Sequence, residues 1–521
     1  MNTPQRPLER KDVLFVNTSR LLLSCLLGMA LATPAPAEPT PGYNTEIPAK
    51  VMTPDTVETR LGTLKFFDGR PDERTVKAVY DNLDFSRGVE TFLNGIPATS
   101  IEGLRLGMLD LGAAKCHQVV IFEQLLDSNS LFLTGNTDTV YASGFLNLKE
   151  DGPTVVEIPK GCGPGTVNDA YFRFVTDMGG PGPDRGEGGK YLILPPDYEG
   201  EVPKGYFVSK SPSYVNWLIL RGFLVDGKTD YSVNMFKTGL KVYPLSAVQS
   251  PPEMEFINGS GKTFNTIHAN NYEFFEELHT VIEREPVDLL EPQLRGLFAS
   301  VGMQKGKPFQ PDARMKGILT DAVAVGNATA RAMAFDTRDT SAYLYPKSYW
   351  KEAFIGGDYR WLIADGEGGR NLDARTMYFY LATVNTPAMA LKMIGKGSQY
   401  AFATQDKDGA YFDGSKNYKL DVPADVPAKD FWSVVVYDPQ TRSELQTSQP
   451  LPSRNNKRDK LQFNEDGSCT LYFGPKAPAG KESNWVQTVP GKGWLAIFRL
   501  YGPLEPWFDK TWRLKDFELM K

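Results

Sequence analysis

The chain has 521 residues, of which 41% are hydrophobic and 23% charged, and its formal net charge is −6. This composition is that of a globular protein long enough for two or more domains, and the acidic balance argues against nucleic acid or an anionic membrane surface as a partner. The 12% aromatic content, with 48 glycines and 38 prolines, favours many short strands joined by tight turns.

Residues 1–37 have the pattern of a signal peptide. Basic residues precede an apolar run over 21–32 that is too short to span a bilayer. Ala35-Pro36-Ala37 then fits a cleavage site before Glu38. A lipoprotein signal at Cys25 is the rival interpretation, but the apolar run continues beyond that cysteine. We expect a periplasmic or secreted protein without a membrane span.

The following residues predict an N-terminal β domain with helices over 71–260. Residues 38–70 are polar and rich in proline, which indicates an extended arm. Apolar residues at helical spacing predict a helix from Pro71, a second over 101–111 and a short third over 119–126. Apolar and alternating runs predict strands over 154–159, 171–177, 191–195, 205–210 and 214–224.

The rest of the chain predicts a helical connector over 261–370 and a C-terminal β domain over 371–521. A further helix is expected over 374–384, and strands over 431–438, 470–474 and 494–502, with turn-forming Asp-Pro and Asp-Gly pairs between strands. The predicted fold class is mainly β with a helical connector, as two jelly-roll-like or β-sandwich domains.

Beyond the predicted signal peptide the chain keeps three cysteines, Cys116, Cys162 and Cys469. An odd number cannot be fully paired within one chain, so at most one disulfide is expected. Cys116–Cys162 is the more plausible pair because both residues fall in the same half. Three buried free thiols are an equally acceptable outcome.

Familiar catalytic and cofactor patterns are absent from the sequence. The three histidines are not spaced to place two metal ligands on one helical face, and no cysteines have C-x-x-C spacing. The sequence also lacks a nucleophile elbow, a P-loop and a dinucleotide fingerprint. We therefore predict no cofactor and no metal site.

The stretch 136–141, Asn-Thr-Asp-Thr-Val-Tyr, supplies the first candidate site residues. Asp138 could act as an acid or base, and Asn136 and Tyr141 could orient a ligand. The alternative is that Asn136 and Asp138 cap the adjoining turn. Tyr141 and Tyr171 could line a pocket, or simply pack with their hydroxyls satisfied.

Arg173, Arg221 and Arg499 fall in largely apolar predicted strands. A half-buried arginine needs an anionic partner, which is either a carboxylate of the chain or the carboxylate or phosphate of a ligand. We favour the internal partner, with the acidic residues of the neighbouring predicted strands and turns as candidates: Asp138, Asp177 and Asp438.

Asn484, Trp485 and Tyr501 form a third group of candidates in the C-terminal half. Together they could make an aromatic wall with one amide donor, which is a common arrangement for a small ligand. An inter-strand core cluster explains the same residues equally well.

Motifs in both halves resemble known families. Residues 136–141 with Trp-Leu-Ile-Leu-Arg at 217–221 resemble the domain of unknown function 1254. The C-terminal half resembles the usual partner of that domain, the domain of unknown function 1214. The matching residues are 431–433, 436–438, 466–468, 484–485, 499–503 and Trp512. The resemblance covers most of the chain from about residue 75. It implies often exported bacterial-type proteins with jelly-roll-like domains, and no settled reaction.

The first functional hypothesis is an exported binding or structural module for a small molecule or polymer, with a small anionic or aromatic ligand. The second is a metal-independent hydrolase or lyase that uses Asp138 with an arginine as anion holder. The third is an assembly protein whose sheet edges pair into homo-oligomers.

Overall fold

The computed structural model describes residues 45–521, so the predicted signal peptide lies outside the described residues. The chain divides into two compact units, one ending at Thr75 and the other running from Val76 to Lys521. In the first unit, part of the predicted arm forms a small antiparallel sheet of β1 (Thr56–Thr59), β2 (Gly62–Phe67) and β3 (Arg70–Pro71).

Helix makes up 28% and strand 26% of the structure, so the fold is mixed α/β with several sheets, and the predicted mainly β class is confirmed only in part. The helices are α1 (Glu73–Asp110), α2 (Leu148–Asp151), α3 (Asp230–Gly239), α4 (Glu273–Arg284), α5 (Pro292–Ser300), α6 (Ala313–Phe335), α7 (Leu372–Leu381), α8 (Pro387–Ala390) and α9 (Glu505–Phe508). None of the helices within 45–521 is both long and apolar enough to cross a membrane.

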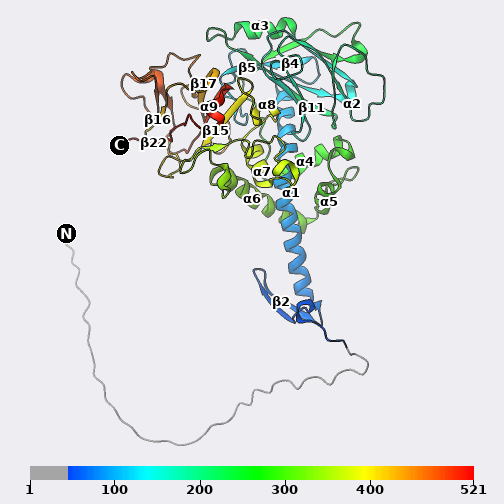
Figure 1. The fold of residues 1–521 in the computed structure, drawn as a ribbon. Helices are drawn as coiled ribbons and strands as arrows, with labels where there is room; N and C mark the ends of the chain where they lie inside the picture. Colours follow the sequence, from blue (N-terminus) through cyan, green and yellow to red (C-terminus); the bar gives the residue numbers. More distant parts are fainter. Residues whose placement is uncertain (1–44) are drawn as a thin grey trace, which may run out of the picture. The chain divides into compact units, whose positions relative to one another are not determined.

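Helix α1 accounts for much of the unexpected helix content. The sequence predicted two helices over this range, but one helix of 38 residues continues through Pro97. Glycines let neighbouring segments approach it closely, since a Cβ on Gly103 would lie 2.5 Å from the carbonyl oxygen of Thr266. Helices α4 to α7 gather around this helix beneath the sheets (Figure 1).

The N-terminal β region contains two sheets. One has six strands in the order β13 (Glu255–Asn258), β4 (Gln118–Ile121), β5 (Thr139–Asn147), β11 (Val215–Phe223), β7 (Gly165–Asp169) and β8 (Phe174–Met178). The other has four, in the order β10 (Phe207–Lys210), β9 (Gly189–Leu194), β6 (Thr154–Ile158) and β12 (Lys241–Pro244). Most strands predicted between 154 and 224 are therefore confirmed.

Two local predictions in this region are wrong. The expected short helix over 119–126 is strand β4 at its start, because a short, fully apolar run looks the same in a buried helix and a buried strand. The expected strand over 171–177 begins only at Phe174. Before it, Phe172 adopts a left-handed φ of 56°, and the Asp169 carboxylate accepts hydrogen bonds from the amides of Tyr171 and Arg173. Arg173 therefore lies in a turn.

The C-terminal β region also contains two sheets. The larger has the order β14 (Lys351–Glu352), β15 (Ser398–Ala403), β21 (Leu495–Pro503), β17 (Ala428–Tyr437) and β18 (Ser453–Asn455). The smaller has the order β20 (Trp485–Gln487), β19 (Cys469–Gly474), β16 (Tyr418–Val422) and β22 (Glu518–Leu519). The strands expected over 431–438, 470–474 and 494–502 and the helix expected from 374 are confirmed.

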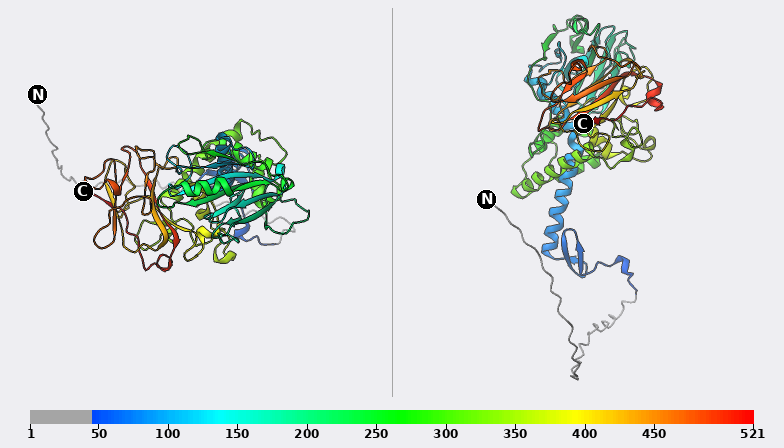
Figure 2. Two further views of the ribbon diagram at one scale, coloured as in Figure 1. Left: turned by 90° about the horizontal axis from the view of Figure 1, so that it is seen from above. Right: turned by 90° about the vertical axis from the view of Figure 1, so that its left-hand side faces the viewer.

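Each larger sheet uses its two faces differently. In β11, Leu218 and Leu220 pack in a core shared with the four-stranded sheet, whereas Trp217 and Ile219 point the other way. The six-stranded and five-stranded sheets thereby each direct one face into a common central core with α1, α4, α6 and α7. Figure 2 shows the two β regions side by side above these helices. Side chains alternate along a strand, so any polar residue on these inner faces is buried between the regions.

The three cysteines are buried free thiols, so the Cys116–Cys162 pair does not form in the structure. Burial raises the pKa of each thiol to about 12. Thiols of this kind are poor nucleophiles at neutral pH, and these cysteines act as small core residues.

Candidate functional site

Asn136 holds the turn that leads into β5. Its Oδ1 accepts hydrogen bonds from the amides of Asp138 and Thr139 at 2.9 and 3.1 Å. Its Nδ2 donates to the hydroxyl of Tyr141. The side chain thus caps the turn and orients a tyrosine that points into the central core.

Asp138 joins this turn to the C-terminal sheet. Its Oδ2 accepts a hydrogen bond from the Ser433 hydroxyl at 2.5 Å, and its Oδ1 accepts one from Asn455 Nδ2 at 3.0 Å. The Tyr501 hydroxyl lies 3.4 Å from Oδ2. Through these contacts, the fully buried carboxylate links the two β regions.

Arg499 makes a second connection between the same regions. Its Nη1 donates to the Tyr437 hydroxyl at 2.5 Å, and its Nη2 donates to the carbonyl oxygen of Thr134 at 2.7 Å. Tyr437 in turn donates to the carbonyl oxygen of Gly135 at 2.6 Å. The side chain is only 3% exposed, so its charge lies deep inside the protein.

Arg221 faces the same space from the N-terminal sheet. It lies opposite Tyr141 in the β5–β11 register, and its guanidinium carbon is 5.9 Å from the centre of the tyrosine ring. Opposite residues of an antiparallel pair share a face, which explains why both point into the central core. Arg221 is 6% exposed, and its Nε has no hydrogen-bond partner.

Neither arginine has the carboxylate partner that the sequence led us to favour. Within the described residues, Arg221 and Arg499 form no salt bridge, whereas Arg173 pairs with Asp169 at 2.6 Å. The prediction of a carboxylate partner within the chain is thus confirmed for Arg173, although that partner, Asp169, is not one of the three predicted acids.

Glu444, a further acid near Arg499, forms no salt bridge within the described residues. Its side chain is 2% exposed, and neither carboxylate oxygen has a hydrogen-bond partner. Burial raises the pKa of Glu444 well above its usual range, which favours the neutral form of the group.

The two arginines line a cavity of about 60 Å³, hereafter the chamber. Asn136, Tyr141, Tyr378 and Tyr400 also line the chamber. Much of the remaining lining is apolar and comes from α7, the loop after it and the C-terminal sheet: Met377, Leu381, Val384, Met389, Phe402 and Ile497. The chamber therefore has a cationic, hydroxyl-rich part and a hydrocarbon part.

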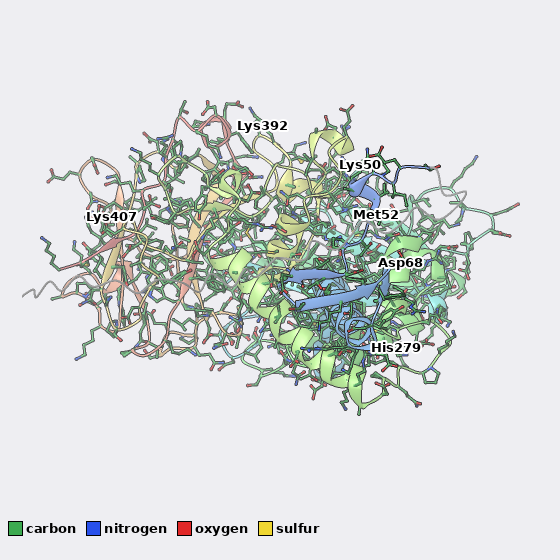
Figure 3. The ribbon with its side chains drawn as sticks, turned by 90° about the horizontal axis from the view of Figure 1, so that it is seen from below. Lys50, Met52, Asp68, His279, Lys392 and Lys407 are labelled. Atoms are coloured by element: carbon green, nitrogen blue, oxygen red, sulfur yellow. The ribbon has the colours of Figure 1, made fainter. Side chains whose placement is uncertain are left out.

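A larger outer pocket of about 350 Å³ adjoins the chamber and shares Ala353, Met389 and Tyr400 with it. Lys392, labelled in Figure 3, and Lys510 line this outer pocket. Both lysines pair with glutamates, Lys392 with Glu505 and Lys510 with Glu352. The two cavities therefore share part of their lining.

The other predicted site residues lie elsewhere. Tyr171 and Arg173 line a separate groove. Asn484 bonds to the Gln462 amide and the Thr470 carbonyl at 2.8 and 2.9 Å, and Trp485 Nε1 donates to the Gly474 carbonyl. Asn484 and Trp485 therefore have the contacts of an inter-strand structural cluster.

The structure brings together six of the predicted residues: Asn136, Asp138, Tyr141, Arg221, Arg499 and Tyr501. It adds Tyr378 and Tyr400, which sequence reasoning missed. Tyr400 lies directly opposite Arg499 in the β15–β21 register. Only the strand pairing reveals this proximity, because the two residues are far apart in the sequence.

The molecule is thus a protein of two β regions whose inner sheet faces each contribute one buried arginine to a common chamber. The family model for a protein of unknown function, DUF1254, matches residues 116–244, and the model for DUF1214 matches residues 397–505. The chain therefore carries a DUF1254 domain followed by a DUF1214 domain, as its motifs predicted. Arg221 belongs to the first domain and Arg499 to the second.

One solved structure shows a similar fold. The VPA0106 protein from Vibrio parahaemolyticus is 18% identical, with a TM-score of 0.53 over 84% of this chain and 100% of that chain. An uncharacterized protein from Burkholderia cenocepacia is 11% identical, with a TM-score of 0.39 over 85% and 96% of the two chains. No curated protein matches the sequence. The first similarity supports the fold alone.

Proposed function

We propose that this chain is an exported binding protein that holds a short-chain carboxylate in the chamber between its two domains. The observation that carries this proposal is the burial of Arg221 and Arg499 without a salt-bridge partner in the described residues. Transfer of a charge into the protein interior costs several kcal/mol unless an opposite charge compensates it. A bound anion would provide that compensation.

The shape and chemistry of the chamber select the kind of anion. A volume of about 60 Å³ suits formate, acetate or a similar ion and is too small for a drug-sized molecule. A carboxylate accepts hydrogen bonds from guanidinium groups with good geometry. The apolar wall near Met377, Leu381 and Val384 would then contact the alkyl group.

We prefer this binding role to a hydrolase or lyase that uses Asp138. Both oxygens of Asp138 already accept hydrogen bonds from Ser433 and Asn455. The Asp138 side chain is also not part of the chamber wall. Its contacts are those of a structural group, while the arginines face open volume.

The test is thermal unfolding in the presence of sodium acetate, with ionic strength held constant by sodium gluconate, whose anion is too large for the chamber. Acetate at about a hundred times its dissociation constant is expected to stabilise the protein by about 2.7 kcal/mol. Acetamide, which has nearly the same shape and no charge, is expected to give no stabilisation.

The Arg221→Met variant separates binding from folding. Removing a buried cation that has no salt-bridge partner should leave the free energy of unfolding unchanged or slightly higher. The same change should weaken acetate binding at least about tenfold, since a hydrogen bond to a charged group contributes roughly 1.5–3 kcal/mol. An acetate response that survives in Arg221→Met, or an equal response to acetamide, would contradict the proposal.

The export part of the proposal rests on the basic, apolar and Ala-Pro-Ala succession of residues 1–37. Cleavage after Ala37 would leave a mature chain that begins at Glu38. Mass spectrometry of the protein produced in a bacterial host is expected to find this shortened chain outside the cytoplasm. Recovery of only the full-length chain from the cytoplasm would refute export.

A further inference from the structure

A second site lies on the other side of α7 from the chamber. It is a groove of about 780 Å³ between α1, the turn before β8, α5 and the segment that leads into α7. In α7, Arg375 and Phe379 line the groove, whereas Met377, Tyr378 and Leu381 line the chamber. The groove is thirteen times larger by the same measure, so the two sites would take different ligands.

The groove contains two arginines that no acidic side chain neutralises by direct contact. Arg375 is 9% exposed, donates from Nη2 to Asn94 Oδ1, and has no partner for its Nε. Arg370 is exposed and donates to the carbonyl oxygen of Arg360. Neither residue forms a salt bridge in residues 45–521, in contrast to Arg173 and Arg360, which pair with Asp169 and Asp358.

The charges of Arg370 and Arg375 also act on each other. Partial desolvation of its guanidinium, and next the charge of Arg375, lower the pKa of Arg370 from its usual value, although the side chain is exposed. Two acids in the groove lining, Glu90 and Glu291, have exposed side chains that water can solvate. An anionic group between Arg370 and Arg375 would relieve the repulsion between them.

Two residues that line the groove each carry a buried polar atom without a hydrogen-bond partner. Trp361 is 2% exposed and its Nε1 donates to no acceptor, while Asn385 is 4% exposed and its Oδ1 accepts from no donor. An unsatisfied buried group of this kind costs about 1–3 kcal/mol. A hydroxyl group has both the acceptor that the first atom lacks and the donor that the second atom lacks.

Aromatic rings make up much of the remaining wall. Phe174 and Tyr359 pack edge to face with ring centres 5.7 Å apart, and Phe172 stacks on Phe379 at 5.2 Å. A second pocket of about 350 Å³ continues the groove through Tyr171, Leu289 and Leu290. Such walls favour a flat aromatic body by edge-to-face and offset packing.

We propose that this groove binds a hydroxylated aromatic carboxylate. Its carboxylate would lie at Arg370 and Arg375, its hydroxyl would bond to Trp361 and Asn385, and its rings would pack against the aromatic wall. This proposal does not depend on the chamber, because the chamber is too small for such a molecule.

The test is a fluorescence titration of the whole mature chain with 6-hydroxy-2-naphthoate. Saturable binding is expected, and two partial analogues should each bind at least about tenfold more weakly, because each lacks one of the polar groups. The analogues are 2-naphthol, without the carboxylate, and 2-naphthoate, without the hydroxyl. Absence of saturation at millimolar ligand, or equal binding of all three compounds, overturns the proposal.

Variants test whether the ligand binds in the groove. Arg375→Met is expected to weaken 6-hydroxy-2-naphthoate binding at least about tenfold. Leu294→Trp, which fills part of the groove without removing a charge, is expected to abolish binding even if Arg375→Met folds poorly. Arg338→Met is the matched control, since this arginine is 87% exposed and pairs with Asp373 near the start of α7.

Arg338→Met and Arg221→Met should both bind the naphthoate as the unmodified chain does. Full affinity in both Arg375→Met and Leu294→Trp would exclude the groove as the site. If Arg221→Met loses the stabilisation by acetate but still binds the naphthoate, the chamber and the groove are independent sites. Failure of one proposal then leaves the other testable.

Discussion

The Arg499→Met variant is expected to have a free energy of unfolding about 2–6 kcal/mol lower than that of the unmodified chain. Arg499 differs from Arg221 because its guanidinium donates to groups that have been removed from water, namely the Thr134 carbonyl and the Tyr437 hydroxyl. Methionine fills similar space but leaves these buried acceptors without a donor, at roughly 1–3 kcal/mol for each. The contact between the two domains should weaken accordingly.

Guanidinium-induced unfolding near neutral pH measures this effect. The Arg338→Met control should lose less than about 1 kcal/mol, because exposed salt bridges contribute little. A loss in Arg499→Met as small as that of the control would show that Arg499 does not fasten the domains together. The comparison with Arg221→Met is equally informative, since there the expected change is close to zero.

The second large effect concerns His268, which lies in the central core between aromatic rings. It is 2% exposed, its ring meets that of Phe274 edge to face at 5.5 Å, and its Nδ1 bonds to the Ala269 carbonyl oxygen. Burial, and next the charge of Arg442, lower the pKa of His268 from 6.5 to about 3. The folded protein therefore keeps this imidazole neutral at pH values where the unfolded chain protonates it.

The sign of the pH dependence follows from this lowered pKa. Above about pH 6.5 the group is neutral in both states and has no effect, and as the pH falls further the unfolded state gains a proton that the folded state excludes. By pH 4.5 this should cost about 2–3 kcal/mol of unfolding free energy, at 1.36 kcal/mol for each pH unit. The loss continues until the pH reaches the folded pKa.

The His268→Phe variant tests this assignment because it keeps an aromatic ring and removes the titrating group. Unfolding free energies of both proteins should be measured near pH 7.5 and pH 4.5. The variant is expected to lose about 2–3 kcal/mol less than the unmodified chain over this range. Equal losses in both proteins would mean that His268 is not kept neutral by its burial.

The sequence was most informative where a pattern is local. Strands such as β6, β9, β11, β17 and β21 follow from continuous apolar or alternating runs between turn residues. The same alternation placed Arg221 and Arg499 within apolar strands, which identified both as buried cations that need a partner. The motif at 136–141 likewise marked the segment that connects the two domains.

Other features depend on contacts between distant segments. Internal ion pairs were predicted for Arg221 and Arg499 because acids occur in other predicted strands and turns, but Asp138 bonds to Ser433 and Asn455 instead. The pairing of Arg499 with Tyr400 across two strands carries no local signal. The groove residues Arg370, Arg375, Trp361 and Asn385 were missed because no motif unites them.

The most direct test of the central claim is a crystal structure of the protein soaked in sodium bromide, with anomalous scattering recorded at the bromine edge. Bromide is a small monoanion that can replace a carboxylate at a guanidinium. We predict an anomalous peak inside the chamber beside Arg221 and Arg499, and no such peak in crystals of Arg221→Met. A chamber without bromide, in crystals whose surface sites are occupied, would contradict the assignment of an anion site to these two arginines.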